Sequence, residues 1–283
     1  MDSNGKTRKQ TLAPVTVVIP CYCCANTIER AVISVVNQTM PPKEIILVDD
    51  GSQDAGKTAG ALREIQRRSM SDVTCKILTM PCNRGQSAAR NAGWDSATEP
   101  FVAFLDADDA WHPKKLEIQY KWMDKHPRAA LTGHPTITKH EETGWEKLPD
   151  RWEFWQVSAW RLLIRNRFPT RSVMLRRTVE FRFDPSKRYA EDYLLWLEIM
   201  MAGHEAWRVE LPLACSYKPD FGVAGLSADL WRMERGELKT YKHLYERKHI
   251  RLLALWGLML WSLLRYFRRI LSLPLQNNWI LKR

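Results

Sequence analysis

The chain has 283 residues, of which 45% are hydrophobic, and a net charge of +11, so it is long enough for a full α/β core with a tail. The charge is uneven, because residues 226–283 carry 12 Lys and Arg against 4 Asp and Glu. No internal repeat or low-complexity stretch is visible, which excludes repeat architectures.

Short apolar runs alternate with amphipathic segments at the start of the chain. Residues 1–12 are polar and lack the apolar stretch of a signal peptide, and a β-branched strand follows at 15–19. Asn26 and Glu29 resemble a capping box ahead of a helix, and a second strand covers 44–48. This order predicts two parallel strands joined by a right-handed crossover.

The same alternation continues as far as residue 105. The pattern predicts further elements in this order: a helix at 55–70, a strand at 76–79, a helix at 86–96 and a strand at 101–105. No G-x-G-x-x-G follows the first strand, so a dehydrogenase-type dinucleotide fold is not expected. Residues 14–110 are therefore interpreted as an α/β nucleotide-binding half.

The second half covers residues 111–225. A helix is expected at 110–126 and another at 192–201, which Gly203 would end. Between them lie four tryptophans that either fill a core or an interface, or stack on a sugar ring: Trp145, Trp152, Trp155 and Trp160.

The basic tail, residues 226–283, contains an uncharged run of 13 residues from Leu252 to Leu264, flanked by arginines. This is too short for a bilayer span of about 20 residues, so we expect an interfacial helix whose basic side chains meet an anionic membrane surface. A helix packed on the rest of the protein is the alternative. Leucine-rich stretches do not suit nucleic-acid binding, so no nucleic-acid partner is expected.

Six cysteines are present, and three of them crowd into residues 21–24. This pattern suits reduced thiols in a cytosol. Together with the tail, it predicts a peripheral or monotopic protein on the cytoplasmic face of a membrane.

Acidic clusters follow two apolar runs and precede the late helix: Asp49-Asp50, Asp106 to Asp109 and Glu191-Asp192. Crowded carboxylates repel one another unless a cation or hydrogen-bond donors offset their charge. In open α/β sheets, ligands bind beyond the carboxyl ends of the strands. The clusters therefore predict a site for a metal-bound nucleotide sugar.

Four ordered motifs across residues 14–205 carry a family resemblance: VVIPCYCCANTIERAVISVVNQTMPPKEIILVDDGSQD, NRGQSAARNAG, FVAFLDADD and EDYLLW. Together they resemble glycosyltransferase family 2. The resemblance implies the GT-A fold, an α/β architecture with a Rossmann-like, mixed but mainly parallel sheet flanked by helices. The domain boundaries expected on this basis are a flexible 1–13, a catalytic domain at 14–225 and the tail at 226–283.

The resemblance also implies a nucleotide-sugar site. Pro20 and Tyr22 would line the base pocket, and Asp50 would accept a hydrogen bond from the base imide. Arg84 and Arg90 would approach the diphosphate, which a guanidinium suits. Each has a structural alternative, since Pro20 can simply end a strand, Asp50 can belong to a turn, and either arginine can pair with a surface acid.

Asp106 and Asp108 match the D-x-D signature of the family. Alternation along an extended segment would point both carboxylates the same way, so that Asp106 meets the ribose or a metal-bound water and Asp108 meets the metal. Mg²⁺ or Mn²⁺ fits, because such oxygen sites are completed by water and substrate phosphates. Asp109 is interpreted as the cap of the following helix rather than as a further ligand.

By the same resemblance, Asp192 is the catalytic base that takes the proton from the acceptor hydroxyl. A helix N-terminus favours the anion, although that position equally allows Asp192 only to satisfy free backbone amides. The Q-x-x-R-W motif of processive synthases is missing after Asp192, so transfer of a single sugar is expected.

The function expected is a metal-dependent, inverting transfer of one sugar from a nucleotide donor, with UDP as the nucleotide, to a lipid-linked or polysaccharide precursor. One alternative keeps this chemistry with a soluble or protein acceptor and uses the tail as an oligomer interface. A second alternative is a catalytically silent scaffold on the same fold.

Overall fold

The computed structural model describes residues 11–68, 72–139, 144–217 and 229–280. The strands are β1 (Ala13–Cys21), β2 (Pro42–Asp49), β3 (Thr74–Thr79), β4 (Phe101–Phe104), β5 (Asp109–Trp111), β6 (Ala129–Gly133), β7 (Thr136–Thr138), β8 (Phe154–Val157), β9 (Met174–Arg176), β10 (Glu205–Val209) and β11 (Ala214–Ser216). The helices are α1 (Ile28–Val36), α2 (Lys57–Arg68), α3 (Gln86–Asp95), α4 (Lys115–Lys125), α5 (Ala159–Ile164), α6 (Glu191–Met201), α7 (Leu230–Glu246) and α8 (Leu252–Ile280), with a 3₁₀ turn at Thr170–Ser172.

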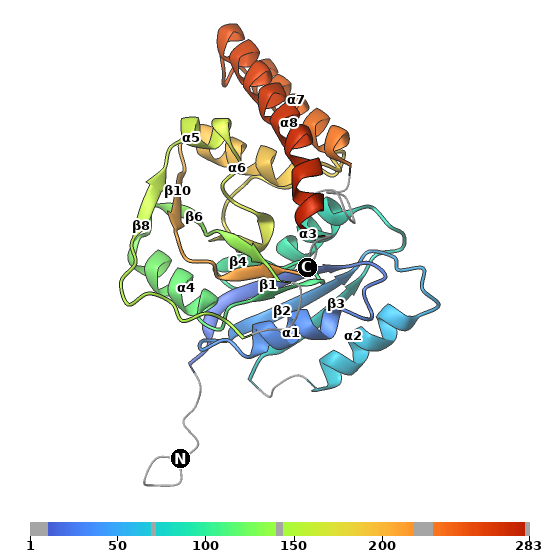
Figure 1. Ribbon diagram of the computed structural model, residues 1–283. Coiled ribbons are helices and arrows are strands. Elements are labelled where there is room, and N and C mark those ends of the chain that lie inside the picture. The colour runs from blue at the N-terminus through green and yellow to red at the C-terminus, as the bar shows by residue number, and fades with distance from the viewer. Residues whose placement is uncertain (1–10, 69–71, 140–143, 218–228, 281–283) are drawn as a thin grey trace.

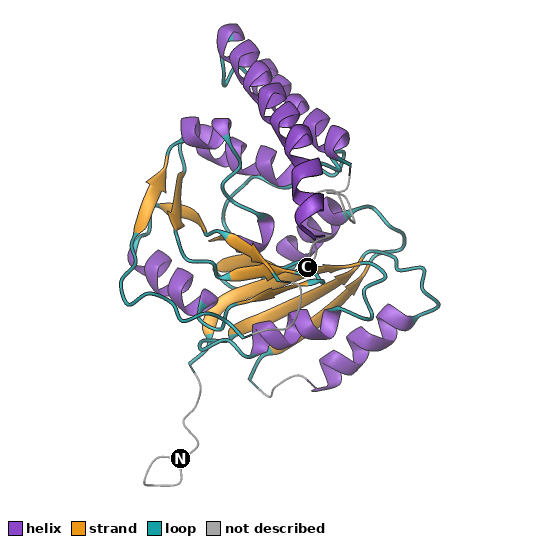
Figure 2. Cartoon of the chain, viewed as in Figure 1, coloured by secondary structure: helices purple, strands orange, loops and turns teal. Residues whose placement is uncertain are grey.

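One eight-stranded sheet forms the centre of the molecule, in the order β3-β2-β1-β4-β9-β6-β10-β8 (Figure 2). The strands β1, β2, β3 and β4 run parallel to one another, whereas β9 runs antiparallel to both β4 and β6. Because β9 comes late in the chain, the predicted nucleotide-binding half and the half that follows share one continuous sheet. A small second sheet has the order β5-β11-β7.

Alternate residues of β1 face two separate cores. Val17 and Ile19 belong to the cluster that includes Ile28 of α1, whereas Val18 belongs to the cluster that includes Trp94 of α3. Successive side chains of a strand point to opposite faces, so an unbroken apolar run is what a strand covered on both faces requires. Figure 1 shows α1 and α2 beneath these strands and α3 above them.

Helix α3 lies unusually close to the sheet because Gly93 has no side chain. A Cβ built on Gly93 would lie 2.4 Å from Cγ1 of Val18. The approach sets the height of the N-terminal end of α3, which carries Gln86 and Arg90, above the carboxyl ends of β1 and β4.

The predicted elements of the first half are confirmed, including the parallel pairing of β1 with β2. Gly203 has a φ of +91° just beyond α6, as expected of a residue that ends a helix. Two details are wrong. The N-cap of α1 is Thr27, without a side-chain cap, and the expected helix at 110–126 is the short strand β5 followed by α4.

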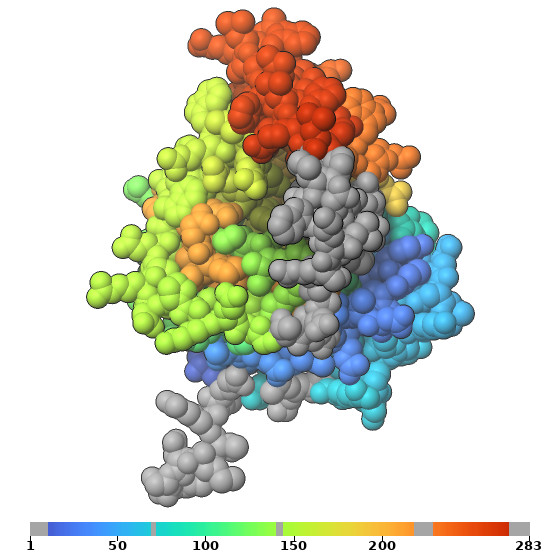
Figure 3. Space-filling view, viewed as in Figure 1, coloured from blue at the N-terminus to red at the C-terminus, as the bar shows by residue number. Residues whose placement is uncertain are grey.

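The tail forms two helices, α7 and α8, that lie side by side and project beyond the sheet (Figures 1 and 3). Along α8, Leu255, Leu258 and Ser262 are buried, whereas Leu253, Trp256 and Leu260 are exposed. The helix is therefore packed on one face and open on the other. Within the described part of the chain, no helix combines the length and apolar content that a membrane crossing needs.

Two predicted boundaries lie wholly or partly outside the described residues. The boundary at 225/226 falls between the last described residue of the catalytic part and α7. Of the expected flexible segment 1–13, residues 1–10 are outside the description, and Ala13 already belongs to β1.

Changing Gly93 to Ala should destabilise the protein by about 1–3 kcal/mol, because the added methyl group overpacks the contact with Val18. Gly60→Ala is the matched control, since nothing lies within 4 Å of a Cβ at Gly60 in α2. That change should instead stabilise by about 0.5–1 kcal/mol through helix propensity. Urea unfolding measures both values, and equal effects at the two positions would contradict the close approach.

Candidate active site

A cavity of about 1490 Å³ opens beyond the carboxyl ends of β1, β2 and β4. All eight residues singled out from the sequence line it: Pro20, Tyr22, Asp50, Arg84, Arg90, Asp106, Asp108 and Asp192. Ligand sites of open α/β sheets lie at this edge. The structure thus brings together residues that lie up to 172 positions apart in the chain.

Pro20 and Tyr22 follow β1 at one end of the cavity, where Tyr22 is exposed. Asp50 is buried, and its two carboxylate oxygens accept the backbone N–H groups of Arg84 and Gly85, both at 2.8 Å. Asp50 therefore fixes the loop ahead of α3, a task that sequence reasoning missed. Its contact with a base, like those of Pro20 and Tyr22, stays a prediction.

The turn after β2 packs directly on the loop that precedes α3. Asp49 accepts the N–H of Ser52 at 3.0 Å, and Gly51 between them has a φ of +65°. A Cβ at Gly51 would lie 2.6 Å from the carbonyl carbon of Cys82. The Asp-Asp-Gly-Ser motif is thus both a tight turn and the support of a cavity wall.

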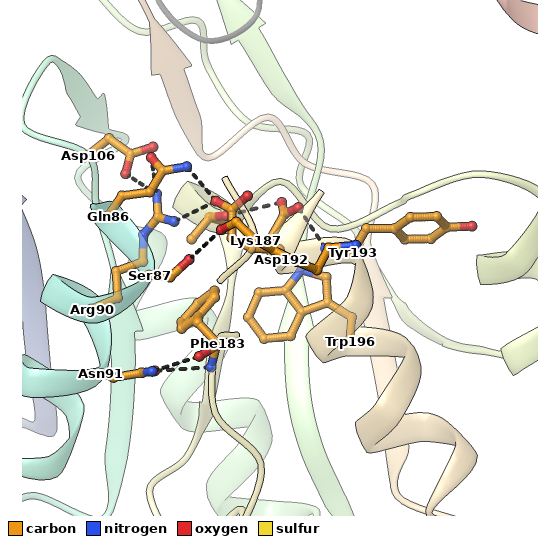
Figure 4. A network of polar contacts seen from close by, with 12 residues as sticks. Gln86, Ser87, Arg90, Asn91, Asp106, Phe183, Lys187, Asp192, Tyr193 and Trp196 are labelled. Carbon is orange, nitrogen blue, oxygen red and sulfur yellow. Dashed lines mark hydrogen bonds and ion pairs between the residues drawn. The ribbon is translucent and has the colours of Figure 1, made fainter. Parts of the chain in front are cut away.

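Arg90 lies at the centre of the polar network in Figure 4. It is only 2% exposed, and its guanidinium donates to Asp106 at 2.6 Å and to Glu191 at 3.1 Å. Gln86, one turn earlier on α3, also donates to Glu191. The structure shows Arg90 joining two acids, while Arg84 is exposed on the cavity wall, and a diphosphate contact by either arginine stays a prediction.

The network shifts the proton affinities of its members. Burial lowers the pKa of Arg90, but the charges of Asp106 and Glu191 outweigh this and raise it above its ordinary value. Burial and the neighbouring charge of Asp192 raise the pKa of Glu191 to about 7, against the lowering effect of Arg90. Ionised Glu191 is a buried negative charge, which is costly unless the positive charge of Arg90 balances it.

Asp192 lies in the first turn of α6, as predicted, and faces the cavity. Its Oδ1 accepts the N–H of Tyr193 at 2.6 Å, and its Oδ2 accepts the hydroxyl of Thr170 at 3.1 Å. Burial raises the pKa of Asp192, which Arg90 and these two donors oppose. The carboxylate thus makes the backbone contact that the structural alternative requires, and its role as a base stays a prediction.

The D-x-D segment forms a turn rather than the extended strand expected. β4 ends at Phe104, and the N–H of Asp109 donates to the carbonyl of Asp106 at 3.1 Å. The alternation argument for Asp106 and Asp108 is therefore wrong, although both residues still line the cavity.

Asp109 does not cap the helix that follows it. It is buried in β5 and pairs with Arg171 at 2.7 Å, and α4 has Lys114 as its N-cap. Burial raises the pKa of Asp109 to about 7, although the charge of Arg171 opposes this. The ion pair thus ties the D-x-D turn to the 3₁₀ turn that contains Arg171.

The carboxylates present fit a Mg²⁺ or Mn²⁺ ion. Asp106 and Asp108 line one cavity, and ions of this kind take one or two carboxylates and complete their shell with water and substrate phosphates. Among residues 11–68, 72–139, 144–217 and 229–280, no group of three or more His, Cys, Asp and Glu side chains could hold a metal ion. The donor set therefore suits an ion that arrives with a phosphate-bearing substrate.

The tryptophans after residue 144 do not serve this cavity. Trp152 and Trp160 are exposed, and Trp145 packs edge-on against His112 at 5.2 Å. No tryptophan of the described chain is among the residues that line the cavity. Of the two interpretations, packing or an interface fits their positions, and stacking on a sugar in this cavity does not.

Comparison with known proteins gives the family. The model of "Glycosyl transferase family 2" matches residues 16–188. WfgD of Escherichia coli, named a UDP-Glc:alpha-D-GlcNAc-diphosphoundecaprenol beta-1,3-glucosyltransferase, is 30% identical over 187 residues, which cover 66% of this chain and 69% of that enzyme.

Two solved structures give the fold. TarS of S. aureus in complex with UDP-GlcNAc has a TM-score of 0.67 at 15% identity and covers 90% of this chain and 72% of its own. The mannosyltransferase PcManGT of Pyrobaculum calidifontis, in complex with GDP-Man and Mn²⁺, has a TM-score of 0.62 at 19% identity, with coverage of 86% and 68%.

The expected GT-A fold is confirmed by this similarity and by the mixed sheet flanked by helices. The order of the motifs, their convergence on one cavity and the match to the family model agree. The chain belongs to glycosyltransferase family 2 and is a glycosyltransferase.

Proposed function

We propose that this enzyme transfers one sugar from a UDP-linked donor to a hydroxyl of a lipid-linked or polysaccharide precursor, with inversion at the anomeric carbon. The observation that carries the proposal is the position of Arg90, which joins Asp106 of the D-x-D turn to the Glu191-Asp192 pair at the start of α6. In this proposal the D-x-D turn holds the leaving group and Asp192 is the base, and both line the same cavity.

In this proposal Asp192 takes the proton from the acceptor hydroxyl while that oxygen attacks the anomeric carbon. A base works best when its pKa lies near the working pH, and the burial that raises the pKa of Asp192 moves it in that direction. Thr170 and the amide of Tyr193 hold its carboxylate in place. Asp106 and Asp108 would hold a Mg²⁺ or Mn²⁺ ion, which when bound neutralises the departing diphosphate.

The choice of donor and acceptor draws on named relatives. WfgD is named for a UDP-Glc donor and a diphosphoundecaprenol-linked acceptor, and TarS was solved with UDP-GlcNAc. A Mn²⁺ ion accompanies GDP-Man in PcManGT, which supports metal use here. A silent scaffold is disfavoured because every carboxylate that the chemistry needs lines the cavity.

UDP-sugars with Mn²⁺ should raise the melting temperature of the purified protein. At about 100 times the dissociation constant, the gain in stability is about 2.7 kcal/mol. Asp108→Asn should abolish the gain. Asp192→Asn should keep it but lower transfer to a lipid-linked acceptor by about 10²–10⁴, the range for a lost general base. Asp124→Asn, an exposed acid on α4, is the matched control.

Two results would contradict the proposal. If no UDP-, GDP-, dTDP- or CMP-sugar shifts the melting temperature with either metal, the silent scaffold becomes the better account. If Asp192→Asn transfers sugar at the wild-type rate, Asp192 only satisfies the amide at the start of α6.

We also propose that the open face of α8 contacts an anionic membrane, at the cytoplasmic side. Its exposed side chains are apolar and recur at helical spacing: Leu253, Trp256, Leu260, Leu264, Phe267 and Leu271. Trp160 and Ile164 of α5 add to the same apolar surface, since α5 contacts α8 and Trp261 donates to the carbonyl of Ile164. Arg251, just before α8, and Arg268 within it are exposed, which favours anionic headgroups.

Replacing Leu260 and Leu264 by Glu should reduce binding to phosphatidylglycerol vesicles at least tenfold. Each leucine loses about 1.5–3 kcal/mol of apolar burial, and both are more than half exposed, so the fold should be retained. Ile33→Glu on α1, where Ile33 is exposed on a different helix, is the control. Vesicle flotation measures the effect, and unchanged flotation of the double variant would contradict a membrane role for α8.

A further inference from the structure

One wall of the cavity is strongly basic on the side away from the D-x-D turn. Six arginines line it: Arg165, Arg167, Arg208, Arg265, Arg268 and Arg269. They come from the loop after α5, from β10 and from the middle of α8. Three segments far apart in the sequence thus place positive charge on the same wall of the cavity.

Helix α8 carries two different faces, and the arginines belong to the inner one. Leu258, Ser262, Arg265 and Arg269 follow one another at intervals of four, three and four, so they share a helix face. Leu258 and Ser262 are buried on that face, and Arg265 and Arg269 continue it into the cavity. The exposed leucines lie on the outer face of the same helix.

Local acids balance only part of this charge. Glu237 pairs with Arg265, and Glu210 pairs with Arg208 at 2.8 Å. Burial raises the pKa of Glu234, which moves that acid toward its neutral form. The wall therefore keeps an excess of positive charge next to the cavity.

Two of the arginines contain a buried donor atom that has no hydrogen-bond partner. The Nε atoms of Arg167 and Arg265 are buried without a partner. Burial lowers the pKa of Arg167, and the charges of Arg208 and Arg165 lower it further, so these cations repel one another. Such a cluster is costly unless an anion joins it.

The basic wall adjoins the base rather than the leaving-group site. Arg165 and Arg167 flank Asn166, whose amide approaches Asp192 at 3.5 Å, and Thr170 of the same loop donates to Asp192. Asp106, in contrast, lies on the other side of Arg90. The structure therefore holds a second place for an anion, on the side from which the acceptor hydroxyl must reach Asp192.

We propose that Arg165, Arg167 and Arg269 bind the diphosphate of a lipid-linked acceptor, so that its first sugar lies at Asp192 and its hydrocarbon chain leaves along the outer face of α8. The inference rests on the proposed function and names its acceptor class. A diphosphate suits several guanidinium groups, each of which offers paired donors in a fixed plane. One substrate that is both anionic and apolar then explains why α8 has arginines on its inner face and leucines on its outer face.

Calorimetric titration with farnesyl diphosphate tests this, with the protein already saturated with UDP and Mn²⁺. The wild type should bind the probe, and farnesyl monophosphate should bind at least tenfold more weakly. Arg165→Gln with Arg269→Gln should weaken farnesyl diphosphate at least tenfold while the affinity for UDP stays unchanged. The control is Arg247→Gln with Arg251→Gln, two exposed arginines outside the cavity wall that lose the same net charge.

Three outcomes would overturn the inference. Displacement of farnesyl diphosphate by UDP would make the basic wall part of the donor site. Equal weakening by the control pair and the cavity pair would mean that only net charge matters. Equally tight binding of soluble dihexanoyl phosphatidylglycerol, with the same arginine dependence, would assign the wall to membrane headgroups.

The same titrations separate this inference from the proposed function. If UDP with Mn²⁺ binds and farnesyl diphosphate does not, the acceptor assignment fails and the donor chemistry stands. If neither binds, the proposed function fails with it. Unchanged UDP affinity in the cavity variant also shows that the variant is folded.

Discussion

A single buried guanidinium holds the two halves of this site together. Arg90 reaches from α3 to Asp106 after β4 and to Glu191 at the start of α6. Arg90 and Glu191 are both buried, where either charge alone would be costly, so their pairing stabilises the fold. The spacing between the D-x-D turn and the start of α6 is therefore set by an ion-pair network rather than by loop conformation.

The tail is part of this arrangement and not a detachable appendage. Tyr241 of α7 packs against Tyr193 of α6, and both hydroxyls donate to the carbonyl of Leu163. Lys187, which lines the cavity, donates to Thr240 of α7 at 2.7 Å. A change in the position of α7 and α8 would reach the start of α6 through these contacts, which couples the proposed membrane face to the cavity.

Local sequence signals were sufficient for the first half of the fold. Apolar β-branched runs gave the strands, and helical spacing gave α1, α2 and α3. The predicted site residues at the ends of β1, β2 and β4 meet in one cavity because parallel strands end at the same edge of a sheet. The prediction that Asp109 caps a helix was wrong because it depended on a distant partner. Asp109 pairs with Arg171, which is 62 residues later in the chain. The basic wall was also missed, because its arginines are scattered between residues 165 and 269 and no local pattern joins them.

A double-mutant cycle between Arg90→Gln and Glu191→Gln tests the central claim most directly. The free energy of unfolding would be measured in urea for the wild type, both single variants and the double variant. The account predicts that the double variant is less destabilised than the sum of the single effects, by about 1 kcal/mol or more, as for residues within one buried network. Effects that add within about 0.3–0.5 kcal/mol would show that Arg90 and Glu191 do not depend on each other, and would contradict the account.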